Sequence, residues 1–71
     1  MTLSIGEKVR ILLRRKKTTI AALAILLGTS RQNLTNKLNR DNLTEKDLKD
    51  IAEALGCQFE VFFIFADGEK I

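Results

Sequence analysis

Apolar residues recur at helical spacing through most of the chain, and the spacing changes near its end. Four stretches carry apolar residues three or four positions apart: from Ile5 to Lys16 or Lys17, from Ile20 to Leu27, from Ser30 to about Asn39, and from Glu45 to Leu55. This spacing places the apolar side chains on one face of an α-helix. The pattern therefore predicts four helices, with turns at Gly28, at residues 40–42 and at Gly56.

Capping residues support the ends of these helices. Ser4 with Glu7, and Thr44 with Asp47, have the three-residue spacing of a capping box, in which each side chain satisfies a free backbone N–H of the first turn. Gly28 follows the second apolar stretch, where glycine adopts the left-handed conformation that ends a helix. We expect helices to begin after Ser4 and Thr44 and to stop at Gly28.

After Gly56 the apolar period falls to two. Branched and aromatic residues alternate along QFEVFFIFADG, residues 58–68, which predicts a β-strand that ends at the turn Asp67-Gly68. One face, Phe59, Val61, Phe63 and Phe65, is expected to cover the helical core. The other face and the free backbone edge need cover, and the same strand of a second subunit, antiparallel about a two-fold axis, would supply it. The residues expected at this dimer contact are Phe59, Val61, Phe62, Phe63, Ile64 and Phe65. Strand addition by a different protein is the alternative.

Length and composition exclude several classes of protein. A chain of 71 residues forms one domain with a small core. It has no histidine and a single cysteine, so we expect no disulfide, no metal site and no cofactor. Neither a nucleophile–base pair nor a glycine-rich phosphate loop is present, and an enzyme is not expected. Cys57 is interpreted as a small buried apolar residue.

Charge is divided between the two halves of the chain, although the net charge is only +3. Residues 8–40 contain no acid and nine basic residues, Lys8, Arg10, Arg14, Arg15, Lys16, Lys17, Arg31, Lys37 and Arg40. Residues 41–71 contain eight acids and three lysines. This division favours an anionic partner for the first half over a chance arrangement.

No targeting or membrane segment is predicted. The first residues do not place a basic stretch before a long apolar one, and the longest apolar run, Ile20 to Leu27, is far shorter than a bilayer span. A soluble, reduced, cytoplasmic protein with no membrane partner is expected.

The second and third helices have the spacing of a helix-turn-helix. Ala24 lies four residues before Gly28, where a small side chain lets two helix backbones approach. Leu23 and Leu27 before the glycine, and Leu34 after it, are placed to pack inside the crossing. The pattern predicts a tight junction between two short helices.

Two stretches, LAILLGTSRQNLTNKL and LTEKDLKDIAEALG, resemble the Cro and phage-repressor class of helix-turn-helix domains, the XRE family. The resemblance covers roughly residues 5–57. It implies a mainly α, lambda-repressor-like domain of four or five helices that docks its third helix into the major groove of double-stranded DNA, usually as a dimer on a two-fold operator. Ile20 departs from the family, since many members have a phosphate-contacting glutamine there. Lys37 replaces an aliphatic residue that is often buried, with Leu38 taking over its packing, and the chain ends in a Cro-like strand instead of a fifth helix.

The resemblance implies roles for the third helix. Its first turn reaches base edges in this class, which makes Arg31 and Gln32 candidate base-reading residues, with Thr35 and Asn36 one turn further on. An ordinary solvated face is the alternative, but such a face would mix acids with bases, and this one has no acid. The candidate phosphate contacts are Thr19, Ser30, Asn33, Lys37, Asn39 and Arg40. Arg14 to Lys17 either face a phosphate backbone or keep the protein soluble.

The sequence thus predicts a four-helix DNA-binding domain over residues 1–57, with a dimerisation strand and tail over residues 58–71 that belong to the same domain. The expected function is sequence-specific binding of double-stranded DNA as a homodimeric repressor on a pseudo-palindromic operator. An antitoxin-like protein whose strand grips a second protein is the main alternative. An RNA binder is disfavoured, because the basic half exposes no aromatic residues on which bases could stack.

Overall fold

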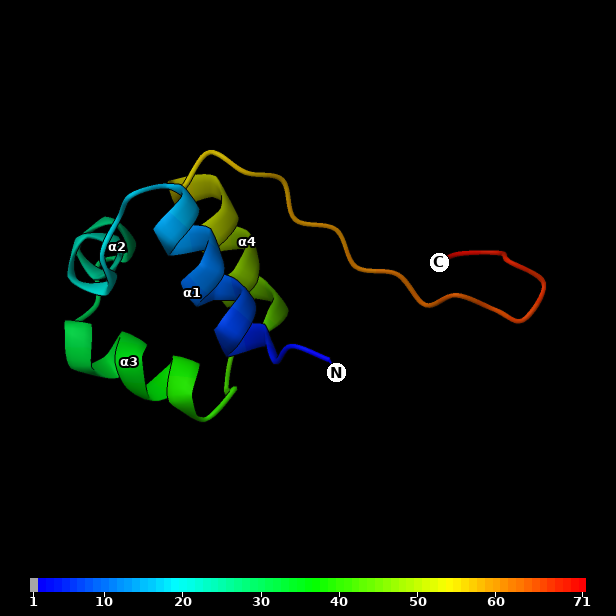
Figure 1. The fold of residues 1–71 in the computed structure, drawn as a ribbon, viewed down its shortest axis with the longest axis horizontal. Helices are drawn as coiled ribbons and strands as arrows, with labels where there is room; N and C mark the ends of the chain where they lie inside the picture. The colour runs from blue at the N-terminus through cyan, green and yellow to red at the C-terminus, as the bar shows by residue number, and fades with distance from the viewer. Residues whose placement is uncertain (1) are drawn as a thin grey trace.

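The computed structural model describes residues 2–71 and contains four helices, which confirms the helices expected from the sequence. They are α1 (Ile5–Arg15), α2 (Ile20–Leu27), α3 (Arg31–Asn39) and α4 (Glu45–Ala54). Figure 1 shows them gathered into one body, from which the chain after α4 extends as an arm. Residues 57–71 are called the arm below.

The capping residues act as the sequence indicated. The Ser4 and Thr44 side chains accept hydrogen bonds from the Glu7 and Asp47 amides, and both capping boxes are complete. Gly28 ends α2 in the left-handed region with φ 71°. This turn lets α3 leave at a steep angle to α2, so that the two helices form the helix-turn-helix.

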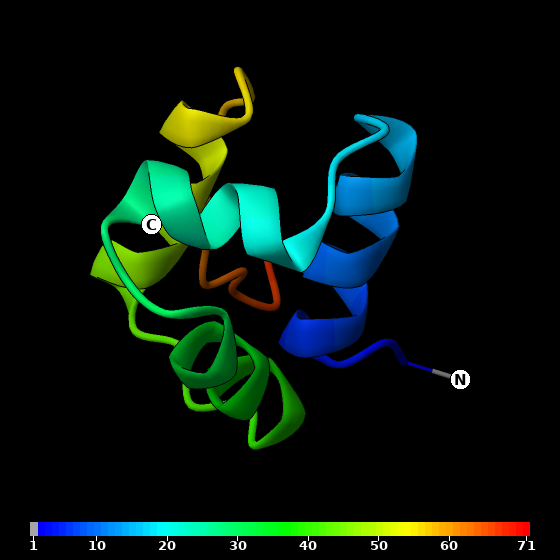
Figure 2. The same cartoon turned by 90° about the vertical axis from the view of Figure 1, so that its left-hand side faces the viewer.

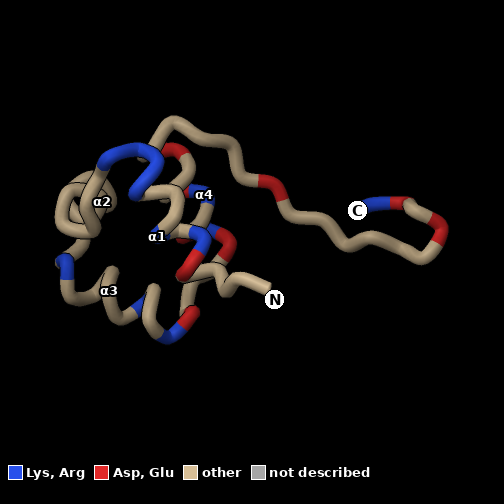
Figure 3. The backbone as a smooth tube through the Cα atoms, in the orientation of Figure 1, with Lys and Arg blue, Asp and Glu red and all other residues tan. Residues whose placement is uncertain are grey.

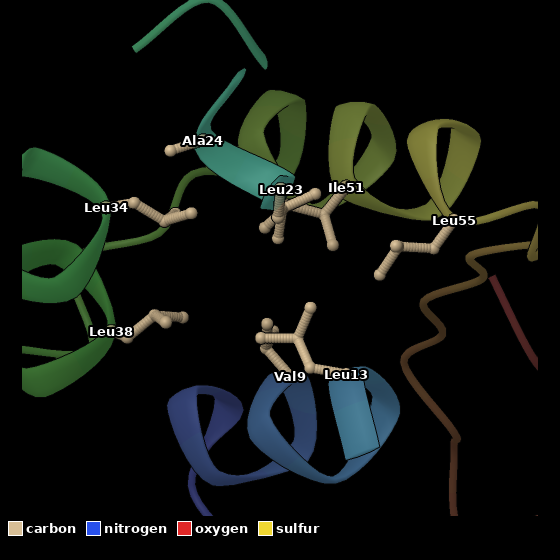
Figure 4. Packing of buried hydrophobic residues seen from close by; sticks show 8 residues of the cluster. All are labelled: Val9, Leu13, Leu23, Ala24, Leu34, Leu38, Ile51 and Leu55. Carbon is tan, nitrogen blue, oxygen red and sulfur yellow. The ribbon is translucent and has the colours of Figure 1, made fainter. Parts of the chain in front are cut away.

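The core lies where the four helices meet. Leu23 of α2 is fully buried at its centre, and Ile51 of α4 lies beside it. Figure 4 shows side chains from all four helices converging on this point. The buried core cluster consists of Val9, Leu13, Leu23, Ala24, Leu34, Leu38, Ile51 and Leu55. Burying Leu23 and Ile51 stabilises the fold by about 1.5–3 kcal/mol each, because a large aliphatic side chain leaves water completely.

A close contact between α1 and α3 was not predicted from the sequence. Gly6 is buried, and a Cβ built on it would collide with the backbone carbonyl oxygen of Leu38. The Gly6 amide also donates to Oδ1 of Asp41 at 2.8 Å. Asp41 holds φ 50° in the turn after α3, a conformation that aspartate tolerates better than most residues. The start of α1 is thereby fixed against the end of α3.

The expected packing of the arm on the core is wrong. Val61, Phe63 and Phe65 do not cover the helices but are exposed, with 76% of Phe63 accessible to solvent. Of the four residues expected to cover the core, only Phe59 is half-buried, and it lies in a groove beside Ile51. The physical reason is that the four helices already enclose the core, and after Gly56, which has φ 69°, the chain runs away from them.

Within residues 2–71 the structure contains no regular strand, so the expected strand is not confirmed. The end of the arm instead folds back on itself as a small hairpin. Phe63 and Ile71 exchange both backbone hydrogen bonds, at 2.6 and 3.0 Å, and the Phe65 amide donates to Glu69 at 2.8 Å. The expected turn at Asp67-Gly68 is present, with Gly68 at φ 93°.

Candidate nucleic-acid interface

The outer face of α3 is entirely polar. Leu34 and Leu38 bury one side of the helix in the core. Gln32 and Asn36 are four residues apart, so at 3.6 residues per turn they lie on the opposite side, and both are exposed. Figure 2 shows α3 next to α2, and in Figure 1 both lie on the side of the body away from the arm. This arrangement presents amide side chains that can each make two hydrogen bonds.

Arg31 and Thr35, also four residues apart, lie along one edge of this outer face. Arg31 is exposed in the first turn of α3, whereas Thr35 is half-buried. The structure brings all four candidate base-reading residues onto two turns of one helix. Thr35 is the least accessible of them.

Two of the candidate phosphate residues are helix caps. The Ser30 hydroxyl accepts the Asn33 amide at 3.1 Å, and the Thr19 hydroxyl accepts the Ala22 amide at 3.1 Å. Each hydroxyl uses its oxygen as an acceptor, so its own proton remains to be donated outward. Free amides of the first helical turn accompany it, which is the arrangement that binds phosphate at helix N-termini.

An open hollow of about 350 Å³ lies beside α3, between its outer face and the turn that follows it. All the residues around it are polar or cationic: Thr29, Asn33, Asn36, Lys37, Arg40 and Asn42. Three expected phosphate residues therefore share one surface with the base-reading residue Asn36.

Lys37 and Asn39 are engaged with other side chains. The Lys37 ammonium lies 3.2 Å from a carboxylate oxygen of Asp47 in α4, and Nη2 of Arg10 donates to the Asn39 side chain. Together with the capping bond from the Thr44 amide, which is the largest effect, the Lys37 contact lowers the pKa of Asp47 below its ordinary value. Lys37 is half-exposed in this pair and can still turn outward.

Arg10 is a residue that sequence reasoning did not assign to the site. It lies on α1, far from α3 in the chain, and reaches the end of α3 only in the folded protein. Its position one turn before Arg14 on a basic helix was the signal available. The contact with Asn39 brings a guanidinium to the end of the polar face.

Basic residues concentrate on α1, on the loop that follows it and on α3. Figure 3 shows lysine and arginine along the end of α1, the following loop and both ends of α3, while the acids lie mainly on α4 and the arm. On α4 most charges are paired within the helix, Lys46 with Asp50 at 2.9 Å and Lys49 with Glu45 at 3.2 Å. The surplus positive charge therefore belongs to the α1–α2–α3 side.

Residues 8–67 match the family model of the Cro/C1-type HTH DNA-binding domain. The chain belongs to this family. The match spans α2, Gly28 and α3, which are the helix-turn-helix, and extends through the phenylalanine-rich part of the arm. In the comparisons with curated proteins and with solved structures, nothing matched the chain. Family membership makes this Cro/C1-type domain a DNA-binding regulator, and it agrees with the position and chemistry of α3.

The part of this Cro/C1-type domain that the structure describes has neither a metal-binding cluster nor a helix that could span a membrane. Residues 2–71 contain no group of three or more histidine, cysteine, aspartate or glutamate side chains that could hold a metal ion. None of the four helices is long and apolar enough to cross a bilayer. Cys57 is half-buried against the core, with its thiol 3.7 Å from the Leu55 carbonyl oxygen.

Proposed function

We propose that the chain is a cytoplasmic, homodimeric transcriptional repressor that recognises a pseudo-palindromic site in double-stranded DNA. The observation that carries the proposal is the outer face of α3, which is exposed, polar, free of acids and held by a Cro/C1-type helix-turn-helix. A helix of this kind fits the major groove, where each base pair presents a distinct pattern of donors and acceptors.

The base-reading roles follow from the side chains. Arg31 can donate two hydrogen bonds to guanine, and Gln32 and Asn36 can each pair with adenine through a donor and an acceptor. Thr35 offers a methyl group to thymine or a hydroxyl to either base. Thr19, Ser30, Asn33 and Arg40 are the proposed phosphate contacts. Lys37 and Asn39 join them when they leave their present partners, Asp47 and Arg10.

The arm supplies the dimer contact in this proposal. Phe63 and Phe65 use their backbone groups inside the hairpin, which turns the N–H and C=O groups of Ile64 toward the free edge. Pairing of two such edges about a two-fold axis would satisfy these backbone groups and bring the exposed apolar side chains of both arms beside one another. To read the proposed operator, the dimer must hold its two copies of α3 about 34 Å apart, one turn of B-DNA.

Repression requires only that the bound dimer occupy a promoter. Selection of bound duplexes from a random DNA pool at roughly physiological salt tests the proposal, because non-specific binding depends steeply on salt. An inverted repeat with half-site centres 10–10.5 base pairs apart is expected. Enrichment of no sequence above non-specific binding would contradict it.

The arm also favours a second candidate function. Six large apolar side chains are exposed on it: Val61, Phe62, Phe63, Ile64, Phe65 and Ile71. An antitoxin-like protein that offers this hairpin to a different protein would show the same surface. Sedimentation of the purified chain separates the two, because the repressor proposal expects a dimer, and the alternative expects a monomer that pairs only with its partner.

A further inference from the structure

α2 exposes an apolar surface that neither the core nor the DNA-binding face uses. All eight of its residues, IAALAILL, are apolar, but only Leu23 and Ala24 are buried. Ile25 is 79% exposed and Leu26 is 61% exposed, and Ala21 and Ala22 beside them are also exposed. These four residues are called the α2 patch. A helix that is apolar all round is normally buried all round, so the patch calls for a partner.

The patch and the arm lie at opposite ends of the molecule. In Figure 1 α2 is at one end of the long axis and the hairpin of the arm is at the other. Figure 2, viewed from the α2 end, shows α2 crossing the front with α3 next to it. If two chains pair through their arms, their α2 patches therefore face outward at the two ends of the dimer, beside the continuing DNA.

We propose that the α2 patch of one dimer packs against the α2 patch of a second dimer bound next to it on the same DNA, so that adjacent sites fill cooperatively. This inference rests on the proposed function, since it requires arm-paired dimers on duplex DNA. The occupant of the patch is a second copy of this chain.

The chemistry of the patch fits an identical partner. A two-fold contact brings each residue near its own copy, so a charged patch would repel itself, whereas α2 has no charged residue from Ile20 to Gly28. Ala21 and Ala22 let two helices approach closely, with Ile25 at the centre. Asp50 and Glu53 of α4 lie beside Leu26, and a contact centred on Ile25 leaves their carboxylates at the solvated rim.

The size of the patch explains why the contact would need DNA. Two large side chains and two alanines are far fewer than the roughly 20–30 residues per side of a stable interface. Such a contact is too weak to hold free dimers together. On one duplex the second dimer is already confined nearby, which raises its effective concentration to the millimolar range.

The test uses duplexes carrying one or two copies of the sequence selected by the protein, with the spacing between the two copies increased one base pair at a time. Wild-type protein should bind the second site about 5- to 150-fold more tightly than a lone site, as for typical coupling between two sites. The gain should recur about every 10.5 base pairs, because the two α2 patches must lie on the same side of the DNA.

The double variant Ile25→Ser, Leu26→Ser should bind a lone site as the wild type does and lose the coupling at every spacing. Serine adds no charge that would alter phosphate binding. The matched control, Leu3→Ser, removes an exposed leucine that lies just before α1 and outside the α2 patch, and it should keep the coupling. Wild-type protein that binds a lone site normally but fills paired sites independently at all spacings would overturn this inference alone. Failure of the wild type to bind even a lone site would overturn the proposed function as well.

Discussion

The Gly6 amide donates to the Asp41 carboxylate at 2.8 Å and joins the first turn of α1 to the turn that follows α3. The two residues are 35 positions apart in the chain. The Cα of Gly6 also faces the Leu38 carbonyl oxygen in the last turn of α3, at a position that leaves no room for a side chain. The angle at which α3 is presented to a partner therefore depends on a glycine in another helix.

Replacing Gly6 by alanine should destabilise the domain by about 1–3 kcal/mol, the usual cost of overpacking a close contact. The new methyl group would meet backbone at Leu38, which cannot move aside as a flexible side chain can. Urea unfolding followed by circular dichroism measures the change. Asp41→Asn is the matched control, because asparagine keeps both an acceptor for Gly6 and tolerance of positive φ. A Gly6→Ala protein as stable as the wild type would show that α1 and α3 do not touch in this way.

Replacing Gln32 or Asn36 by alanine should reduce preference for the selected sequence by about 1–3 kcal/mol, since each loses a bidentate contact to a base. Affinity for unrelated duplexes should change little, because neither side chain is charged. Competition between the selected and a scrambled duplex measures both quantities. Lys49→Ala, on the opposite α4 surface, should leave both unchanged. Equal losses on selected and scrambled DNA would mean that these residues position the protein instead of reading bases.

Proline at position 64 should separate the subunits without opening the hairpin. Within the described residues the Ile64 amide makes no hydrogen bond, so proline removes a donor that only a second chain could use. Phe63→Pro removes the amide that bonds to Ile71 and should disrupt the hairpin itself. Sedimentation equilibrium should show a monomer for Ile64→Pro. A dimer as tight as the wild type would show that the edge of the arm does not pair.

Asp47 should contribute stability that is lost in acid. Its folded-state pKa is lowered by the Thr44 amide and by Lys37, so the unfolded chain binds the proton more readily. The contribution is present above the unfolded value near 4 and disappears as the pH falls through the lower folded value. The unfolding free energy of the wild type, measured between about pH 2 and 6, should thus rise more steeply than that of Asp47→Asn. Parallel curves would exclude a role for this carboxylate.

The helices could be predicted from the sequence because each signal that indicates them is local. Ser4 with Glu7, Thr44 with Asp47, and Gly28 between two apolar stretches all act within a few residues, and the structure confirms their effects. The exposed polar face of α3 also follows from the period of the helix, since burial of Leu34 and Leu38 determines which side chains face outward.

The contacts between residues far apart in the chain could not be predicted from the sequence pattern. Nothing near Gly6 indicates Leu38 or Asp41, and Arg10 meets Asn39 only once α1 and α3 have packed. The packing of the arm was wrongly predicted for a related reason. Alternation in residues 59–65 shows that a segment is suited to pair, but the helices close their core without it. The pattern does not specify what the segment pairs with.

The most direct test of the central claim is an amide NMR titration of the 71-residue chain with its selected duplex. If α3 enters the major groove, the largest amide chemical-shift changes will fall on residues 30–40, which include the Ser30 cap, and on the cap at Thr19. The amides of α4 should change little. Shifts concentrated in residues 58–71, with α3 unaffected, would contradict the account and make the arm the binding surface.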